Sequence, residues 1–184
     1  MRVLFEAKTE GSLQDRVEME VWKGLGGLWQ MELPRGFVPV EEERKRQYFP
    51  YDNSPETALF NEAEDAWITV QLFQKELKRE ETLEAMEKIR KLSADTWPQH
   101  KSTPVFLWSE GEIPVAWFAM TMEDMEKEHV KAVFSFPKGA GRMALLTFTY
   151  PEGSCHKWRP ILEYLFSQIK EEKGEKDYGS NGKG

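Results

Sequence analysis

The stretch that most constrains the fold is Met143–Tyr150, which reads Met-Ala-Leu-Leu-Thr-Phe-Thr-Tyr. Successive side chains of a strand point to opposite faces, so one face here carries Ala, Leu, Phe and Tyr, while the other becomes polar towards its end. A turn containing Pro151 and Gly153 follows, and then an apolar-striped run from Trp158 to Ile169. The stretch therefore predicts a central strand, with one face in a core, that leads directly into the last helix.

Further runs of alternating apolar residues predict the rest of a sheet. Three of them come before the central strand and are separated from it and from each other by short turns, which favours an antiparallel meander of four strands. Two more strands, joined by the short segment 61–65, are expected earlier in the chain, and a short strand is expected at Gln47–Phe49. The five longer segments expected besides the central strand are Thr57–Phe60, Ala66–Phe73, Val105–Trp108, Val115–Met122 and His129–Phe136.

Two helices are expected to pack on this sheet. The segment Glu80–Thr96 contains no Gly or Pro, and two acidic residues lie at its start, where they favour the positive end of a helix. The last helix is expected to begin near Ser154, a good N-cap residue. The expected apolar stripes are Leu83, Met86, Ile89 and Leu92 in the first helix, and Trp158, Ile161, Leu162, Leu165, Phe166 and Ile169 in the last.

The beginning of the chain predicts a β-hairpin. Arg16–Trp22 alternates, with Val17, Met19 and Val21 on the expected core side, and 28–33 alternates again after the glycine-rich turn 23–27. The charged run Glu41–Arg46 is interpreted as a solvated surface segment. The predicted fold class is therefore α+β, a mainly antiparallel β-sheet with helices packed on it and an N-terminal β-hairpin extension.

Length and composition predict one main domain. A chain of 184 residues with 40% hydrophobic residues can bury a substantial core, and no second domain is needed. We expect residues 1–27 to be a β extension, 28–171 to be a single domain, and the Gly-, Lys- and Glu-rich tail 172–184 to be disordered.

Charge and cysteine content limit the partners and the setting. The formal net charge of −7 disfavours nucleic acids and anionic membranes as partners. Cys155 is the only cysteine, so the chain forms no internal disulfide. Glu6 interrupts the first apolar run well before the length of a signal peptide core, and no window has the roughly 18 apolar residues of a membrane span. We therefore expect a cytoplasmic protein that is a monomer or a homodimer.

The order of motifs resembles the PsbP-like α/β/α sandwich superfamily. The similarity covers about residues 28–169 and is carried by Leu33-Pro34-x-Gly36-Phe37, by Ile68-x-Val70-x-Leu72, and by Tyr150-Pro151 followed by Trp158-Arg159-Pro160-Ile161. The superfamily includes a photosystem subunit, a Ran-release factor and many bacterial proteins of unknown function. The resemblance implies helices on a twisted antiparallel sheet and a role in binding rather than catalysis. No segment here corresponds to the GTPase-binding or photosystem-binding residues of those members.

No local motif predicts a reaction, a metal or a cofactor. Cys155 and His156 follow the expected N-cap Ser154, but neighbouring helix residues do not face each other, so Cys155 is interpreted as a small half-buried side chain. The acidic loop 123–129 lacks the ligand spacing of a calcium or zinc site. The glycines of 138–142 lead into a strand and not into a helix, which favours a hairpin turn over a phosphate-binding loop. We therefore expect no catalytic residues, no metal and no cofactor.

Two functions remain in competition. The first is a non-enzymatic protein-binding, adaptor or chaperone-like domain, which the resemblance and the missing catalytic constellation favour. The alternative is a small-molecule-binding protein or hydrolase with a pocket near Trp67, Trp117 and the Cys155/His156 corner. A pocket with converging titratable groups would favour the alternative, and a flat or grooved surface would favour the first.

The sheet itself suggests where a protein partner would bind. One face of the predicted sheet is apolar, whereas the other mixes aromatic residues with Thr, Gln, Lys and Ser. Two helices are too few to cover both faces completely, so we expect the mixed face near Trp67 and Phe73 to be thinly covered by the N-terminal hairpin or to be open. Exposed aromatic residues surrounded by polar ones are typical of binding surfaces. Trp67 and Phe73 are therefore the predicted partner-binding residues.

Overall fold

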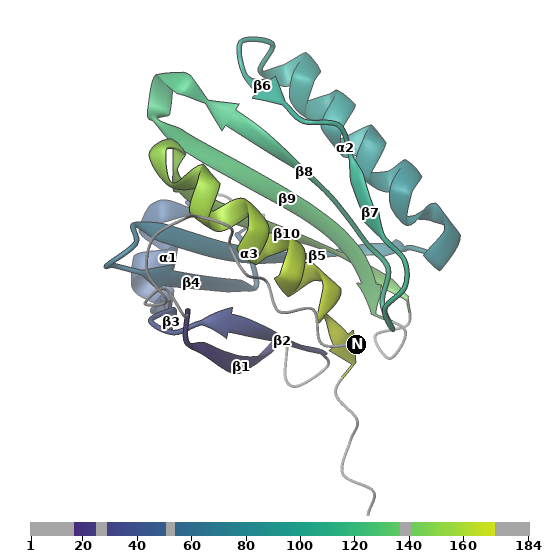
Figure 1. Cartoon of the computed structure of the whole chain (residues 1–184), viewed down its shortest axis with the longest axis horizontal. Coiled ribbons are helices and arrows are strands. Elements are labelled where there is room, and N and C mark those ends of the chain that lie inside the picture. The colour runs from purple at the N-terminus through teal and green to yellow at the C-terminus, as the bar shows by residue number, and fades with distance from the viewer. Residues whose placement is uncertain (1–16, 25–28, 51–53, 137–140, 172–184) are drawn as a thin grey trace, which may run out of the picture.

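The computed structural model describes residues 17–24, 29–50, 54–136 and 141–171. Three helices and eleven strands are present in these segments, together with short 3-10 turns (Figure 1). In chain order they are β1 (Met19–Gly24), β2 (Trp29–Pro34), β3 (Val38–Pro39), α1 (Glu42–Tyr48), β4 (Thr57–Asn61), β5 (Ala66–Glu76), η2 (Arg79–Glu81), α2 (Thr82–Thr96), β6 (Lys101–Ser102), β7 (Phe106–Trp108), β8 (Val115–Met122), η3 (Glu123–Met125), β9 (Lys127–Phe136), β10 (Arg142–Pro151), η5 (Glu152–Ser154), α3 (Cys155–Ser167) and β11 (Lys170–Glu171).

The main sheet has eight antiparallel strands in the order β3-β4-β5-β10-β9-β8-β6, with β7 also paired to β8. The central strand β10 pairs with β5 on one side and β9 on the other, so that Phe148 lies opposite Ile68 and Val130. This confirms the predicted α+β fold, in which the four-strand meander and the strand 66–73 form one sheet. The N-terminal hairpin is also confirmed, because β1 pairs antiparallel with β2.

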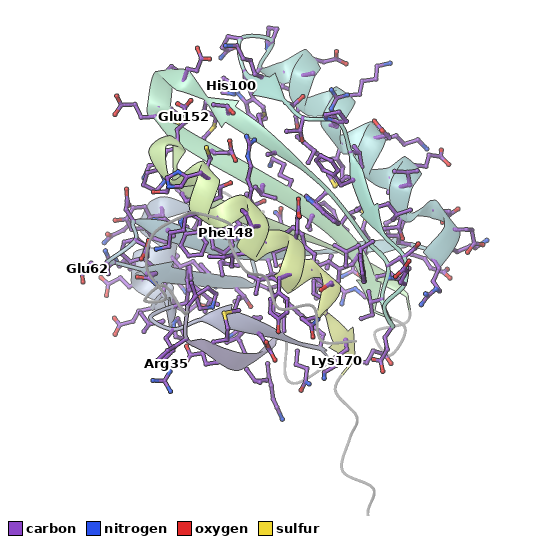
Figure 2. The ribbon with its side chains drawn as sticks, in the orientation of Figure 1. Arg35, Glu62, His100, Phe148, Glu152 and Lys170 are labelled. Carbon is purple, nitrogen blue, oxygen red and sulfur yellow. The ribbon has the colours of Figure 1, made fainter. Side chains whose placement is uncertain are left out.

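The first face of the main sheet is covered by α3 and by the small sheet β1-β2-β11, and α3 crosses in front of the strands in Figure 1. Phe148 lies under α3 at the centre of this layer (Figure 2). The predicted stripe of the last helix is confirmed, since Trp158, Leu162 and Phe166 are buried in the same apolar cluster as Phe148. The helix begins directly after Ser154, as expected, although the Ser154 side chain forms no capping hydrogen bond.

The second face carries α2 over β8 and β9, and α1 over the opposite end at β4 and β5. Met86 of α2 packs in a second apolar cluster with Phe118 and Met120 of β8. At the other end, Tyr48 of α1 contacts the ring of Trp67. Helices therefore lie on both faces, as the resemblance implied.

The apolar stripe predicted for α2 is confirmed at its two middle residues, because Met86 is buried in the second apolar cluster and Ile89 packs against it, and it is wrong at its two ends. Leu83 and Leu92 are 41% and 66% exposed, whereas Ala85 and Ser93 face the sheet. The physical reason is helix geometry: at about 3.6 residues per turn, each step of three residues shifts the position by about 60° around the helix, so the ends of the series, Leu83 and Leu92, turn away from the face that carries Met86 and Ile89.

Two expectations for the beginning of the chain are corrected. The segment 47–49 is not a strand, because Gln47 and Tyr48 form the last residues of α1. The charged run forms that helix, since its acidic residues lie in the first turn and its basic residues in the last, where each complements the helix dipole.

Val21 was expected on the core side of the hairpin, but its side chain is 60% exposed. The half-buried ring of Trp22 packs inward against Trp29 instead. Residues 1–16 and the tail 172–184 lie outside the described residues.

Candidate functional site

A strip of half-exposed side chains lies on the second face of the sheet, between the part that α1 covers and the part that α2 covers. We call it the strip, and it consists of Trp67, Thr69, Gln71 and Phe73 from β5, Leu145, Thr147 and Thr149 from β10, and His129 and Lys131 from β9. The alternation that places these residues on one face also places Ile68, Val70 and Phe148 in the core of the other face.

Trp67 lies at the α1 end of the strip in an aromatic cluster. Its ring centroid is 4.4 Å from that of Phe60 on the neighbouring strand and 4.9 Å from that of Tyr48 on α1. The Arg44 guanidinium lies 5.7 Å from the Phe60 ring centroid and 5.8 Å from the Tyr48 ring centroid, within the range of cation–π contacts. Trp67 is half-buried, and of the two expectations, thin cover by the N-terminal hairpin or an open face, the cover by the hairpin is not found. The hairpin packs on the opposite face, and α1 provides the partial cover.

Phe73 lies on the same face, further along β5 from Trp67. It is half-buried and packs at the edge of the apolar cluster under α2, which contains Leu77 and Met143. Trp67 and Phe73 are therefore the first and last residues that β5 contributes to the strip, and neither is fully buried. Their role in binding a partner stays a prediction.

Two titratable groups of β9 lie between the aromatic ends. Burial lowers the pKa of Lys131, and burial, with smaller contributions from Lys131, His100 and Lys127, lowers the pKa of His129 to about 4. His100 is brought close to His129 by the fold, although the two are far apart in sequence, and its Nε2 lies 3.1 Å from Oδ1 of Asp124. At neutral pH the strip therefore carries a neutral imidazole and a lysine.

The opposite face holds a buried polar cluster centred on Glu128, which is 1% exposed. Arg159 of α3 donates to both carboxylate oxygens, from Nε at 2.8 Å and from Nη2 at 2.6 Å, and the Tyr150 hydroxyl donates at 2.5 Å. Thr121 adds a fourth hydrogen bond at 3.2 Å. Burial alone would raise the pKa of Glu128, but these hydrogen bonds outweigh it and hold the pKa below its usual value. Burial, followed by Glu128 itself, raises the pKa of Tyr150.

This cluster is a structural unit and not a catalytic pair. The two oxygens of the Glu128 carboxylate accept hydrogen bonds from Arg159, Tyr150 and Thr121. Tyr150 stays protonated, so no base is available there for proton abstraction. Sequence reasoning treated Glu128 only as part of an acidic loop. Its alternation with Val130, which faces the core, was the available signal that Glu128 points inward.

The residues of the alternative pocket are only partly brought together. Trp117 lies on the first face against Phe166 and lines a cavity of about 180 Å³ with Arg159 and Glu163, whereas Trp67 lies on the second face. Cys155, the first residue of α3, packs at the edge of the core, and His156 is exposed. The other lining residues of the cavity are Thr103, Phe106, Ala119, Val130 and Leu162.

Two further features of the described residues concern metal binding and membrane insertion. Within the described residues, no three or more His, Cys, Asp or Glu side chains gather in a way that would hold a metal ion. No helix in the described part of the chain is both long and apolar enough to cross a membrane.

Comparison with known proteins identifies the fold. No protein-family model and no curated protein sequence matches this chain. The solution structure of cyanobacterial PsbP (CyanoP) from Synechocystis sp. is similar at a TM-score of 0.57 and 10% identity, over 89% of this chain and 98% of that one. A mutant of protein Mog1 is similar at a TM-score of 0.51 and 12% identity, over 85% of this chain and 97% of that one. The chain therefore has the PsbP-like α/β fold.

Proposed function

We propose that this protein is a non-enzymatic protein-binding or adaptor domain and that the strip is its binding surface. The observation that carries the proposal is the composition of the strip, where half-exposed aromatic side chains at Trp67 and Phe73 flank threonine, glutamine and lysine. Buried aromatic anchors with a polar surround contribute most of the binding energy in protein interfaces. The strand backbone beneath the strip is fixed by pairing on both sides, so a partner would meet a preformed surface.

The chemistry of the rest of the molecule supports binding over catalysis. Three groups with shifted pKa values, Tyr150, Arg159 and Glu128, are already hydrogen-bonded to one another. The resemblance to a superfamily that works by binding supports the same function. We place this activity in a bacterial cytoplasm, in a protein that is a monomer or a homodimer.

A double substitution tests the proposal. Replacing Trp67 and Phe73 together by Ser should abolish capture of the partner that the wild-type protein retains from cells of the native organism, while the protein stays folded in thermal unfolding. The matched control replaces Val21 and Leu107 by Ser, because they are 60% and 44% exposed, lie on β1 and β7 away from the strip, and do not line the cavity. That control should retain the partner.

A second variant covers the case in which the double substitution unfolds the protein. Thr147→Arg adds a bulky side chain at the centre of the strip without removing an apolar contact. Capture that survives both Thr147→Arg and the double substitution would exclude the strip as the binding surface.

The cavity beside Trp117 supports a second candidate function, the binding of a small molecule. Its volume of about 180 Å³ is enough for a ligand the size of one aromatic ring, and its walls combine apolar side chains with Arg159 and Glu163. Titration with phenol, followed through the methyl NMR signals of Val130 and Leu162, tests it. Saturable shifts that disappear in Ala119→Phe, which fills the cavity, would support a ligand site, and unchanged signals would exclude one for this class of molecule.

A further inference from the structure

Lys131 is a charged side chain in an unusual position. It is half-buried on the second face, opposite Thr147 of β10 and Phe118 of β8, with Thr69 one strand further on. Within the described part of the chain, no hydrogen-bond or ion-pair partner of Lys131 is found. The contrast with nearby lysines is clear, because Lys127 pairs with Asp65 and Lys157 pairs with Glu64.

A partly buried ammonium group without a counter-ion is energetically unfavourable. Removing charge from water costs free energy unless an opposite charge or hydrogen-bond acceptors replace the lost hydration. The neighbours of Lys131 along and across the strands supply two threonine hydroxyls, an apolar ring and the imidazole of His129, but no carboxylate. A carboxylate brought by a partner would provide the missing charge.

A second cation lies at the aromatic end of the strip. Arg44 lies over the rings of Tyr48 and Phe60, next to Trp67. The strip and the adjoining Arg44 thus offer two positive charges and an aromatic cluster within a protein whose net charge is −7. An acidic ligand would be repelled by most of the molecule and attracted to this region, which favours one binding orientation.

We propose that the segment bound by the strip is an acidic peptide of a partner protein, one of whose carboxylates pairs with Lys131 while a neighbouring apolar side chain lies against Trp67. The inference rests on the proposed function, because it names the chemistry of the partner at the same surface. The acidic segment belongs to a different protein and not to a second copy of this chain.

The experiment selects binders from a displayed library of short random peptides on the full chain. We expect the selected peptides to be enriched in Asp or Glu next to an apolar residue. Their affinity should fall roughly tenfold or more on Lys131→Met, which keeps the length of the side chain and removes the charge. Lys170→Met, a charge removal at an exposed position on β11, should leave the affinity unchanged. Replacing the peptide carboxylate by Lys should restore binding to Lys131→Glu.

The possible outcomes separate the inference from the proposed function. Peptides that lose affinity for the Trp67/Phe73 double variant, yet bind Lys131→Met as well as wild type, would overturn the inference and leave the function standing. Peptides that bind both variants normally, or a library that yields none, would overturn both. Lys131→Gln replaces Lys131→Met if the latter unfolds. Concentration-dependent dimerisation that Lys131→Met abolishes would assign the strip to a second copy and overturn the acidic-partner proposal.

Discussion

Arg159 of α3 holds the buried carboxylate of Glu128 on β9 through two hydrogen bonds, of 2.8 and 2.6 Å. The pair joins the last helix to the start of β9, an inner strand of the sheet. It differs from a surface ion pair because Glu128 is almost completely buried. The Arg159 side chain is 46% exposed, so the arginine reaches inward from solvent to neutralise a charge that the core could not otherwise contain.

The first prediction concerns this pair. Arg159→Met should lower the free energy of unfolding by about 3 kcal/mol, because it leaves a buried carboxylate without its charged partner. Lys157→Met, on the same helix as Arg159, removes a surface pair with Glu64 of the β4–β5 turn and should cost less than about 1 kcal/mol. Urea unfolding measures both. The double variant Glu128→Leu/Arg159→Leu should be more stable than Arg159→Met alone, and an equal or lower stability would contradict this account.

The second prediction concerns the glycine of the Leu-Pro-x-Gly-Phe motif. Gly36 has a φ of +100°, and a Cβ there would lie 2.9 Å from Nδ2 of Asn61. The Asn61 side chain is buried and donates to the Arg35 carbonyl, so it cannot move away without losing that hydrogen bond.

Gly36→Ala should therefore lower the free energy of unfolding by roughly 1–3 kcal/mol. Gly153→Ala is the control, since no heavy atom lies within 4 Å of a Cβ added there. Thermal or urea unfolding distinguishes the two variants. Equal stability of Gly36→Ala and wild type would mean that the turn tolerates a side chain.

The fold was predictable where alternation and chain order were sufficient. The pattern of Met143–Tyr150 placed β10 at the centre of the sheet, and its pairing with β5 and β9 followed from apolar faces that had to meet. The buried face of α2 was predictable only in part. Apolar spacing identified Met86 and Ile89 correctly, but it also selected Leu83 and Leu92, which are exposed, because a strict three-residue spacing drifts around the helix. The buried Ala85 and Ser93 are small, so the apolar pattern did not mark them.

The candidate site was predictable only in part. The mixed face could be found from the residues of β5 and β10, and so could the position of Trp67 on it. The contact of Tyr48 with Trp67 was missed, because the charged run before Tyr48 was interpreted as a solvated surface segment, although its acidic-to-basic order suits a short helix. The isolation of Lys131 is likewise a three-dimensional property, since it depends on which carboxylates the fold brings near.

The third prediction concerns the start of α3. Cys155→Ala and His156→Ala should each leave the affinity for strip-selected peptides unchanged, because the two side chains lie away from the strip and cannot meet as nucleophile and base. His156→Ala should change stability by no more than about 0.5 kcal/mol, and Cys155→Ala by about 1 kcal/mol. Peptide affinity and thermal unfolding are measured on the same samples. Loss of binding by a folded variant would show that this corner of the molecule has a function.

The last prediction is a pH dependence that arises from His129. Burial keeps the pKa of His129 at about 4, with Lys131, His100 and Lys127 adding to the effect, whereas an unfolded chain has a histidine pKa of about 6.5. The other strand neighbours that face it, Thr149 and Met120, carry no charge. As the pH falls from about 6.5 to about 4, the unfolded state takes up a proton that the folded state does not.

Stability should therefore be lost across that range, by about 2 kcal/mol once the partial exposure of the ring is allowed for. His129→Gln removes the titrating group, so the difference in unfolding free energy between pH 7 and pH 4.5 should be smaller in this variant than in wild type. His156→Gln, at an exposed position, should keep the wild-type slope. Below about pH 4.5, both variants should still lose stability, because protonation of Glu128 breaks its ion pair with Arg159. Parallel pH profiles for His129→Gln and wild type would mean that His129 has the same pKa in the folded and unfolded states, so that burial does not keep the ring neutral in acid.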